Sequence, residues 1–133
     1  MKNLFFELVI FLALFFAVSG CKKEAGEGGN SSISGKVYVR DYNTTFIVLQ
    51  YEYYGPDVDV YIIYGDDKSY SERIRTSYDG TYEFKYLRPG KYHIYAYSKD
   101  STLQTSSEIA KLVDVEISDK KQEVTAPLIT ILK

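Results

Sequence analysis

Apolar and polar residues alternate along most of the chain beyond residue 32, with a period of two residues. In the clearest example, Tyr82, Phe84 and Tyr86 share one side, and Glu83 and Lys85 share the other. This period is typical of a β-strand with one buried face and one solvated face. Beyond residue 20 no segment has the 3.6-residue period of an amphipathic helix, so the pattern predicts strands alone.

Turn signals lie on both sides of this strand. Asp79-Gly80 precedes it and favours a type I′ hairpin turn, which needs a positive φ at both central residues. Pro89-Gly90 follows it and favours a type II turn, because proline presets φ and glycine supplies the positive φ. The next strand alternates again, with Tyr92, Ile94 and Ala96 on one face and His93, Tyr95 and Tyr97 on the other. We therefore predict a central hairpin over Thr76–Ala96.

Further runs of the same kind bring the predicted total to seven or eight short strands. The fourth run is rich in charge, which suits the edge of a sheet. In the seventh run the alternation breaks near Lys111-Leu112, which indicates a β-bulge. The predicted fold is all-β: an antiparallel Greek-key sandwich. Apart from the hairpin, its strands are Ile33–Arg40, Thr45–Tyr54, Asp57–Tyr64, Tyr70–Ser77, Glu108–Ser118 and Glu123–Leu132.

The N-terminus has a different pattern. Lys2 precedes an apolar run from Leu8 to Val18, which is shorter than a membrane-spanning helix and ends in small residues. These features predict a helical signal peptide over residues 1–20, with an uncleaved membrane anchor as the alternative. Val18-Ser19-Gly20-Cys21 resembles the lipobox of bacterial lipoproteins. The resemblance implies that Cys21 is lipidated and becomes the first residue of the mature protein.

A lipidated cysteine implies attachment to the bacterial envelope. Two or more acyl chains, such as palmitate, anchor a protein stably, since each buried methylene contributes about 0.8 kcal/mol. Lys22, rather than an aspartate, follows the cysteine, which favours the outer membrane, on its periplasmic or surface face. Residues 21–32 are charged and rich in glycine and serine, so we predict a flexible tether. Residues 33–133 form the predicted domain.

The residues of the predicted hairpin also carry a family resemblance. Thr76-x-x-Asp79-Gly80-x-Tyr82-x-Phe84-x-x-Leu87-x-Pro89-Gly90-x-Tyr92-x-Ile94-x-Ala96 resembles the carboxypeptidase regulatory-like, or transthyretin-like, β-sandwich. Ile33-Ser34-Gly35-Lys36-Val37 resembles the opening strand of that family, and together the two stretches cover most of Ile33–Ser98. The combination with a lipobox is similar to small lipoproteins that are common in Bacteroidetes.

Members of related families that carry out chemistry have residues that this chain lacks. Zinc carboxypeptidases hold their metal on a separate catalytic domain. Transthyretin-like hydrolases use several histidines and a terminal Tyr-Arg-Gly-Ser, whereas this chain has one histidine and ends in Ile131-Leu132-Lys133. Collagen-adhesin modules join a lysine in the position of Lys36 to an asparagine on their last strand, but Glu123–Leu132 has no Asn or Asp. The chain therefore resembles these families in its fold, but it lacks the residues that carry out their chemistry.

Candidate chemistry in the rest of the sequence is sparse. His93 is the only histidine and Cys21 the only cysteine, so we expect no zinc site, no disulfide, no catalytic residues and no cofactor. A formal charge of −2 with no basic patch argues against nucleic-acid binding. Acidic residues gather near predicted turns, where they are either turn formers or a calcium site. They are Asp57, Asp59, Asp66, Asp67 and Asp79.

Tyrosine is the most distinctive residue type, with 14 copies and no tryptophan. Several of these tyrosines point outward in the predicted strands, and Tyr38 is one of them. Tyrosine is common at recognition surfaces, although it is also simply a good strand former. The candidate partner surface consists of Tyr61, His93, Tyr95 and Tyr97.

These features lead to one favoured hypothesis and two alternatives. The favoured hypothesis is a non-catalytic, lipid-anchored binding or accessory module that meets an envelope protein or a glycan. The alternatives are a structural spacer or assembly subunit of an envelope complex, and a dedicated glycan-binding module. The oligomeric state and the specific partner are left open by the sequence.

Overall fold

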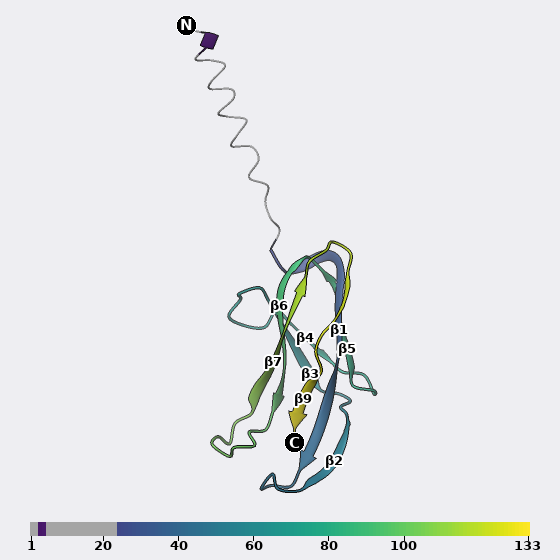
Figure 1. Ribbon diagram of the computed structural model, residues 1–133, viewed down its shortest axis with the longest axis vertical. Helices are drawn as coiled ribbons and strands as arrows, with labels where there is room; N and C mark the ends of the chain where they lie inside the picture. Colours follow the sequence, from purple (N-terminus) through teal and green to yellow (C-terminus); the bar gives the residue numbers. More distant parts are fainter. Residues whose placement is uncertain (1–2, 5–23) are drawn as a thin grey trace.

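A computed structural model of the chain describes residues 3–4 and 24–133 (Figure 1). The predicted signal peptide, apart from residues 3–4, and Cys21 lie outside the described residues. In the described part no helix is long and apolar enough to cross a bilayer. Residues 24–133 form nine strands in two sheets. The strands are β1 (Glu27–Tyr42), β2 (Leu49–Tyr54), β3 (Asp59–Tyr64), β4 (Glu72–Arg75), β5 (Thr81–Leu87), β6 (Gly90–Ser98), β7 (Ile109–Ile117), β8 (Glu123–Thr125) and β9 (Ile129–Leu132).

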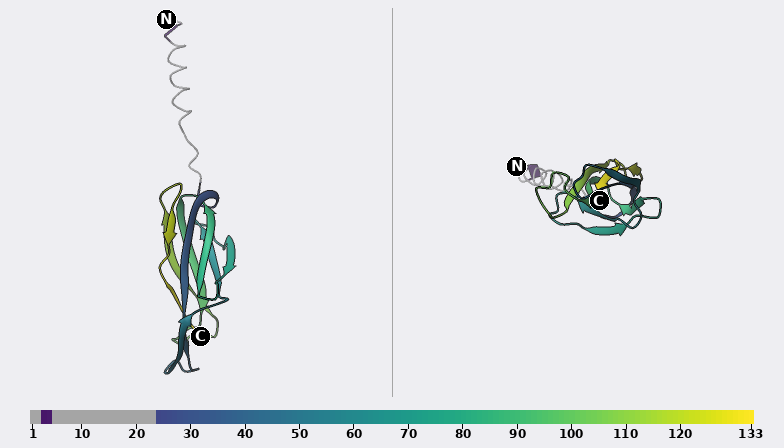
Figure 2. Two further views of the ribbon diagram at one scale, coloured as in Figure 1. Left: turned by 90° about the vertical axis from the view of Figure 1, so that its right-hand side faces the viewer. Right: turned by 90° about the horizontal axis from the view of Figure 1, so that it is seen from below.

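The long strand β1 is the centre of the first sheet. Along one edge it pairs antiparallel with β5 and then β2, and along the other it pairs parallel with β8 and then β9. Val37 marks the change of partner on the first edge: its N–H donates to Gly80 and its carbonyl accepts from the N–H of Gly55. The second sheet is antiparallel, in the order β4-β3-β6-β7. Figure 2 shows the two sheets face to face.

The core lies between the two sheets and comes from alternating positions of their strands. On β1, Ile33, Val37 and Val39 have no exposed surface, as the alternation predicts. Residues from the second sheet face them across the sandwich, including Val60, Ile62, Tyr92, Ile94 and Ala96. The predicted all-β sandwich is therefore confirmed.

Several strand predictions need adjustment. The predicted final strand is divided into β8 and β9 by Ala126-Pro127-Leu128, because proline has no N–H to donate to a ladder. The bulge predicted near Lys111-Leu112 is wrong, since β6 and β7 pair without a shift from Gly90↔Ile117 to Ser98↔Ile109. Leu112 simply faces outward and is 53% exposed. The charged strand β4 does lie at a sheet edge, as predicted.

The predicted central hairpin is wrong in its topology. β4 and β6 belong to the second sheet, whereas β5 between them belongs to the first. Both turns are therefore arches that carry the chain from one sheet to the other. At the first arch the Gly80 N–H donates to Ser77, and of the two predicted positive-φ residues only Gly80 has one. This geometry fits a type I turn that ends in glycine and not a type I′ turn.

Strand β5 also departs from strict alternation at its end. Tyr82 and Phe84 are buried, but Tyr86, predicted to face the same way, is 71% exposed. Tyr86 has a φ of 59°, which is costly for a bulky residue and reverses the direction of the following side chains. Leu87 is buried in its place, and the register with β1 shifts at this point.

Part of the predicted flexible tether, residues 21–32, belongs to the first strand. β1 begins at Glu27, and Gly26 is fixed by hydrogen bonds with the Tyr92 hydroxyl and the Arg88 N–H. A Cβ on Gly29 would overlap the Leu87 carbonyl. Gly29 thus permits close contact between β1 and β5, a role that differs from providing flexibility.

Candidate functional site

Four tyrosines form a continuous cluster on the outward face of the second sheet. The Tyr61 and Tyr95 rings are stacked, with centroids 4.8 Å apart and an interplanar angle of 7°. Tyr97 lies edge-on to both rings, at 5.4 Å from Tyr61 and 5.6 Å from Tyr95. Tyr70 lies edge-on to Tyr61 at 5.0 Å. Offset-stacked and edge-to-face geometries are favourable for aromatic pairs. We call Tyr61, Tyr70, Tyr95 and Tyr97 the tyrosine cluster.

Strand register builds most of this cluster. Tyr61 on β3 lies directly opposite Tyr95 on β6, and Tyr97 follows two residues later on the same face. Directly opposed residues of an antiparallel pair have Cβ atoms about 5 Å apart, so the rings meet. Tyr70 belongs to the loop before β4, and its place in the cluster was not predicted. A loop residue has no alternation that could reveal its direction.

The cluster has a buried base and an exposed rim. Tyr95 is 8% exposed, whereas Tyr97 and Tyr70 are 41% and 51% exposed. Burial, and after it the neighbouring Tyr97 side chain, raises the pKa of Tyr95 to about 12. Tyr95 is therefore neutral at physiological pH, and the two rim tyrosines present the accessible ring surface and hydroxyls.

Two other predicted residues lie apart from the cluster. His93 is on the same face of β6, but its Nδ1 contacts the Asp114 carboxylate on β7. Tyr38 lies on the first sheet, where its ring packs edge-on against Tyr54 at 5.3 Å. The structure thus groups Tyr61, Tyr95 and Tyr97, leaves His93 beside them and separates Tyr38.

A hollow of about 240 Å³ adjoins the cluster at Tyr61 and Tyr97. Three carboxylates line it, from Asp57, Asp59 and Glu108, together with the single cation of Lys133. The Nε of Arg75 donates to Asp59 at 3.3 Å. We call this feature the acidic hollow. Asp57 and Asp59 were calcium candidates, but within residues 3–4 and 24–133 no three His, Cys, Asp or Glu side chains form a group that could hold a metal ion.

Comparison with known proteins places the fold in a family. Residues 32–131 match the family described as BOS complex subunit NOMO1-like, second beta sandwich domain. The chain belongs to this family. The expected β-sandwich family is thus confirmed at that level, but the match is not specifically to the carboxypeptidase regulatory-like domain.

Comparison with individual proteins adds little. Among solved structures, a candidate carbohydrate-binding protein from Pseudomonas aeruginosa is similar, with a TM-score of 0.47 and 15% sequence identity. The alignment covers 89% of this chain and 94% of that chain. No curated protein matches the sequence.

Proposed function

We propose that this NOMO1-like β-sandwich is a non-catalytic binding module of the bacterial envelope, which holds a protein partner on its tyrosine cluster. The observation that carries the proposal is the mutual packing of four tyrosine rings on an outward sheet face. The cluster lies on the solvent side of β3 and β6, whose other sides supply the core.

The cluster has the properties of an interface anchor. Tyrosine combines large contact area with a hydroxyl that donates and accepts hydrogen bonds, and it is enriched among residues that dominate binding energy. Tyr97 and Tyr70 are each held by contact with Tyr61, so they lose little conformational entropy on binding. A pre-ordered, partly apolar patch of this kind favours a protein surface as the occupant.

The acidic hollow indicates what the partner presents. Its lining carries three carboxylates and one ammonium group, beside the rings of Tyr61 and Tyr97. A lysine or arginine side chain that enters the hollow would pair with the carboxylates of Asp57 and Glu108, since that of Asp59 already accepts from Arg75, and would lie near aromatic faces. We therefore propose a partner with a basic side chain at the centre of its contact surface.

The absence of catalysis is part of the proposal. The only histidine, His93, contacts Asp114 on the solvent face, and among residues 24–133 neither side chain forms a hydrogen bond with a serine, threonine or cysteine. We also propose that the resemblance of residues 76–96 to carboxypeptidase regulatory-like domains reflects a shared accessory role. Those domains accompany a catalytic unit and do not themselves carry its metal.

The predicted lipid attachment point determines which end of the domain faces the membrane. Strand β1 begins at the end of the sandwich opposite the β1–β2 turn (Figure 1). Cys21 is three residues before Glu24, and Ala25 packs against the core. We propose that lipid on Cys21 holds this end at the outer membrane, so that the β1–β2 end points away from the bilayer.

Removal of the two rim tyrosines tests the binding surface. In the Tyr70→Ser/Tyr97→Ser variant, we expect affinity for a captured envelope partner to fall at least tenfold, equivalent to about 1.4 kcal/mol or more. The partner is identified by cross-linking in intact cells, then purified, and its Kd is measured at two salt concentrations. Because the proposed contact includes ion pairs, binding should weaken as salt rises.

The matched control is Tyr51→Ser/Tyr78→Ser, which removes two exposed tyrosines outside the cluster. This control should bind normally. Equal losses in the two double variants would contradict the proposed surface. A partner that co-purifies at fixed stoichiometry with every variant would instead favour the spacer or assembly-subunit alternative.

Substitution of the predicted lipid site tests the anchor. Cys21→Ser should move the protein from the membrane fraction to the soluble fraction and abolish incorporation of labelled palmitate, because no acyl chain can attach. Lys23→Ser, two residues away, serves as the control and should remain membrane-bound. If Cys21→Ser stays in the membrane fraction, the uncleaved-helix alternative is favoured.

A further inference from the structure

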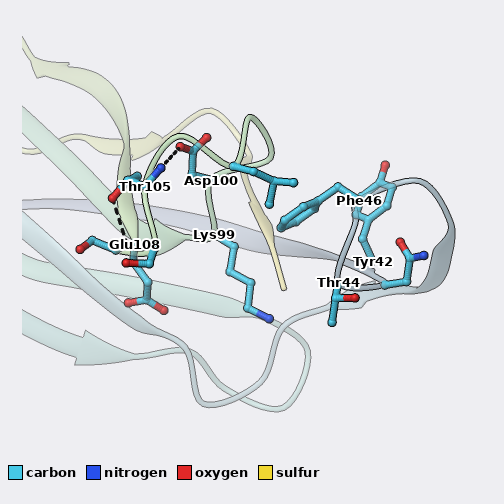
Figure 3. Close-up of a pocket in the computed structure, with 11 residues that line it drawn as sticks. Tyr42, Thr44, Phe46, Lys99, Asp100, Thr105 and Glu108 are labelled. Atoms are coloured by element: carbon cyan, nitrogen blue, oxygen red, sulfur yellow. Dashed lines mark hydrogen bonds between the residues drawn. The ribbon is translucent and has the colours of Figure 1, made fainter.

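A second hollow lies at the β1–β2 end of the domain, between the β1–β2 turn and the loop that joins β6 to β7 (Figure 3). Its volume is about 290 Å³. The last residue of β1 is Tyr42, which lines the hollow together with Thr44 and Phe46 of the turn; the loop contributes Lys99, Leu103 and Glu108. We call it the distal pocket.

Two apolar side chains line the distal pocket from unfavourable backbone conformations. Phe46 has a φ of 56° and Leu103 a φ of 57°, in the left-handed region that bulky residues rarely adopt. Leu103 is nonetheless 60% exposed, so burial does not explain its position. Strained residues of this kind persist where the surrounding structure holds them, often at ligand sites.

Local hydrogen bonds hold both segments in these conformations. The Asn43 side-chain oxygen accepts from the N–H groups of Ile47 and Val48, at 3.0 and 3.1 Å. The Asp100 carboxylate accepts from the N–H groups of Thr102 and Thr105, at 2.9 and 3.2 Å. These side chains brace the turn and the loop, so the pocket is organised before any ligand arrives.

The pocket combines an apolar wall with available polar groups. The Tyr42 and Phe46 rings are in contact, with centroids 6.1 Å apart. The side chains of Lys99, Thr44 and Glu108 make no hydrogen bond to any described residue. Figure 3 shows the Lys99 ammonium extending across the gap toward Thr44. The pocket thus offers a donor, a hydroxyl and a carboxylate beside aromatic and aliphatic surface.

From this arrangement we infer that the distal pocket binds one sugar residue of a saccharide. A pyranose ring presents an apolar C–H face, which matches the Phe46 and Leu103 side chains, and hydroxyls that both donate and accept. Lys99 supplies donors, Glu108 supplies acceptors and the Thr44 hydroxyl supplies either. A volume of about 290 Å³ is near the lower limit for small-molecule pockets, which suits a single ring. This site is separate from the tyrosine cluster, although Glu108 borders both hollows.

The test uses the full chain, purified in detergent, on an array of bacterial and host mono- to tetrasaccharides. A saccharide that binds is then titrated into the wild-type protein and into Phe46→Asn and Leu103→Asn. Asparagine tolerates a positive φ, so both variants should keep or raise the Tm. Both should lose at least tenfold in saccharide affinity, because the apolar wall is gone.

Tyr97→Ser separates this site from the proposed protein surface and should bind the saccharide with unchanged affinity. Three results would overturn the assignment. One is an array with no binding, and another is a saccharide whose affinity survives both asparagine substitutions. The third is an affinity that falls only together with the Tm, since the two residues would then serve the fold.

Discussion

Raising the pH from 10 to 12 is expected to destabilise the domain sharply, because buried tyrosines must remain protonated in the folded state. Tyr82 is 2% exposed, and its hydroxyl has no hydrogen-bond partner among the described residues. Burial raises the pKa of Tyr82 to about 12 and is the first cause that raises the pKa of Tyr95 to about 12. The pKa of tyrosine in an unfolded chain is about 10.

The direction of the effect follows from these pKa values. Below pH 10 the phenols are protonated in both states, so the full stability is present. Between pH 10 and 12 the unfolded chain loses protons that the folded state retains, and the free energy of unfolding falls. Each pKa unit corresponds to about 1.4 kcal/mol, so Tyr82 alone should remove about 2–3 kcal/mol by pH 12. That is a large share of a typical domain stability of about 5–15 kcal/mol.

Urea unfolding at pH 8, 10 and 11.5 measures this loss. Tyr82→Phe should be neutral or stabilising at pH 8, because it removes a buried hydroxyl that lacks a partner, and it should reduce the loss at pH 11.5. Tyr78→Phe is the control, since Tyr78 is 89% exposed and should leave the pH profile unchanged. A Tyr82→Phe profile that parallels the wild type would show that Tyr82 does not carry the effect.

The strands were largely predictable from the sequence, but their sheets were not. Alternation depends only on which side of a strand is buried, and this is the same whether a turn makes a hairpin or an arch. In a hairpin, β5 and β6 would pair; in the arch observed at Pro89, their apolar faces oppose each other across the core. Both arrangements place Phe84 and Ile94 inside.

The start of the domain was misjudged for a related reason. Composition marks Gly28-Gly29 as flexible, but glycine also serves where two backbones approach closely. Only the contact between Gly29 and the Leu87 carbonyl distinguishes the two roles, and that contact joins residues far apart in the sequence. Sequence alone contains no measure of it.

The candidate site was predictable in part. Alternation placed Tyr61, Tyr95 and Tyr97 on outward faces, and the pairing of β3 with β6 brought them together. Tyr38 has the same outward direction but lies on the other sheet, because alternation does not assign strands to sheets. The distal pocket was not predicted at all, since it depends on turns that hold Phe46 and Leu103 in left-handed conformations.

Phe84→Ala is expected to lower the free energy of unfolding by about 3–5 kcal/mol, enough to unfold much of a marginally stable domain. Phe84 is 1% exposed, lies opposite Ile33 of β1 and packs against the Tyr82 ring at 5.9 Å. Truncation would therefore leave a cavity where the two sheets meet. Chemical denaturation monitored by circular dichroism measures the change.

Comparison of Phe84→Ala with Tyr86→Ala, two residues later on the same strand, tests the change in side-chain direction at the end of β5. Strict alternation predicts that both side chains face the core, so both truncations should be severely destabilising. The structure instead leaves Tyr86 71% exposed, and its truncation should change stability by no more than about 0.5 kcal/mol. Alanine keeps a Cβ at the positive φ, so relief of backbone strain cannot mask a loss of packing. Equal, large losses in the two variants would mean that β5 continues without its shift and that Tyr86 belongs to the core.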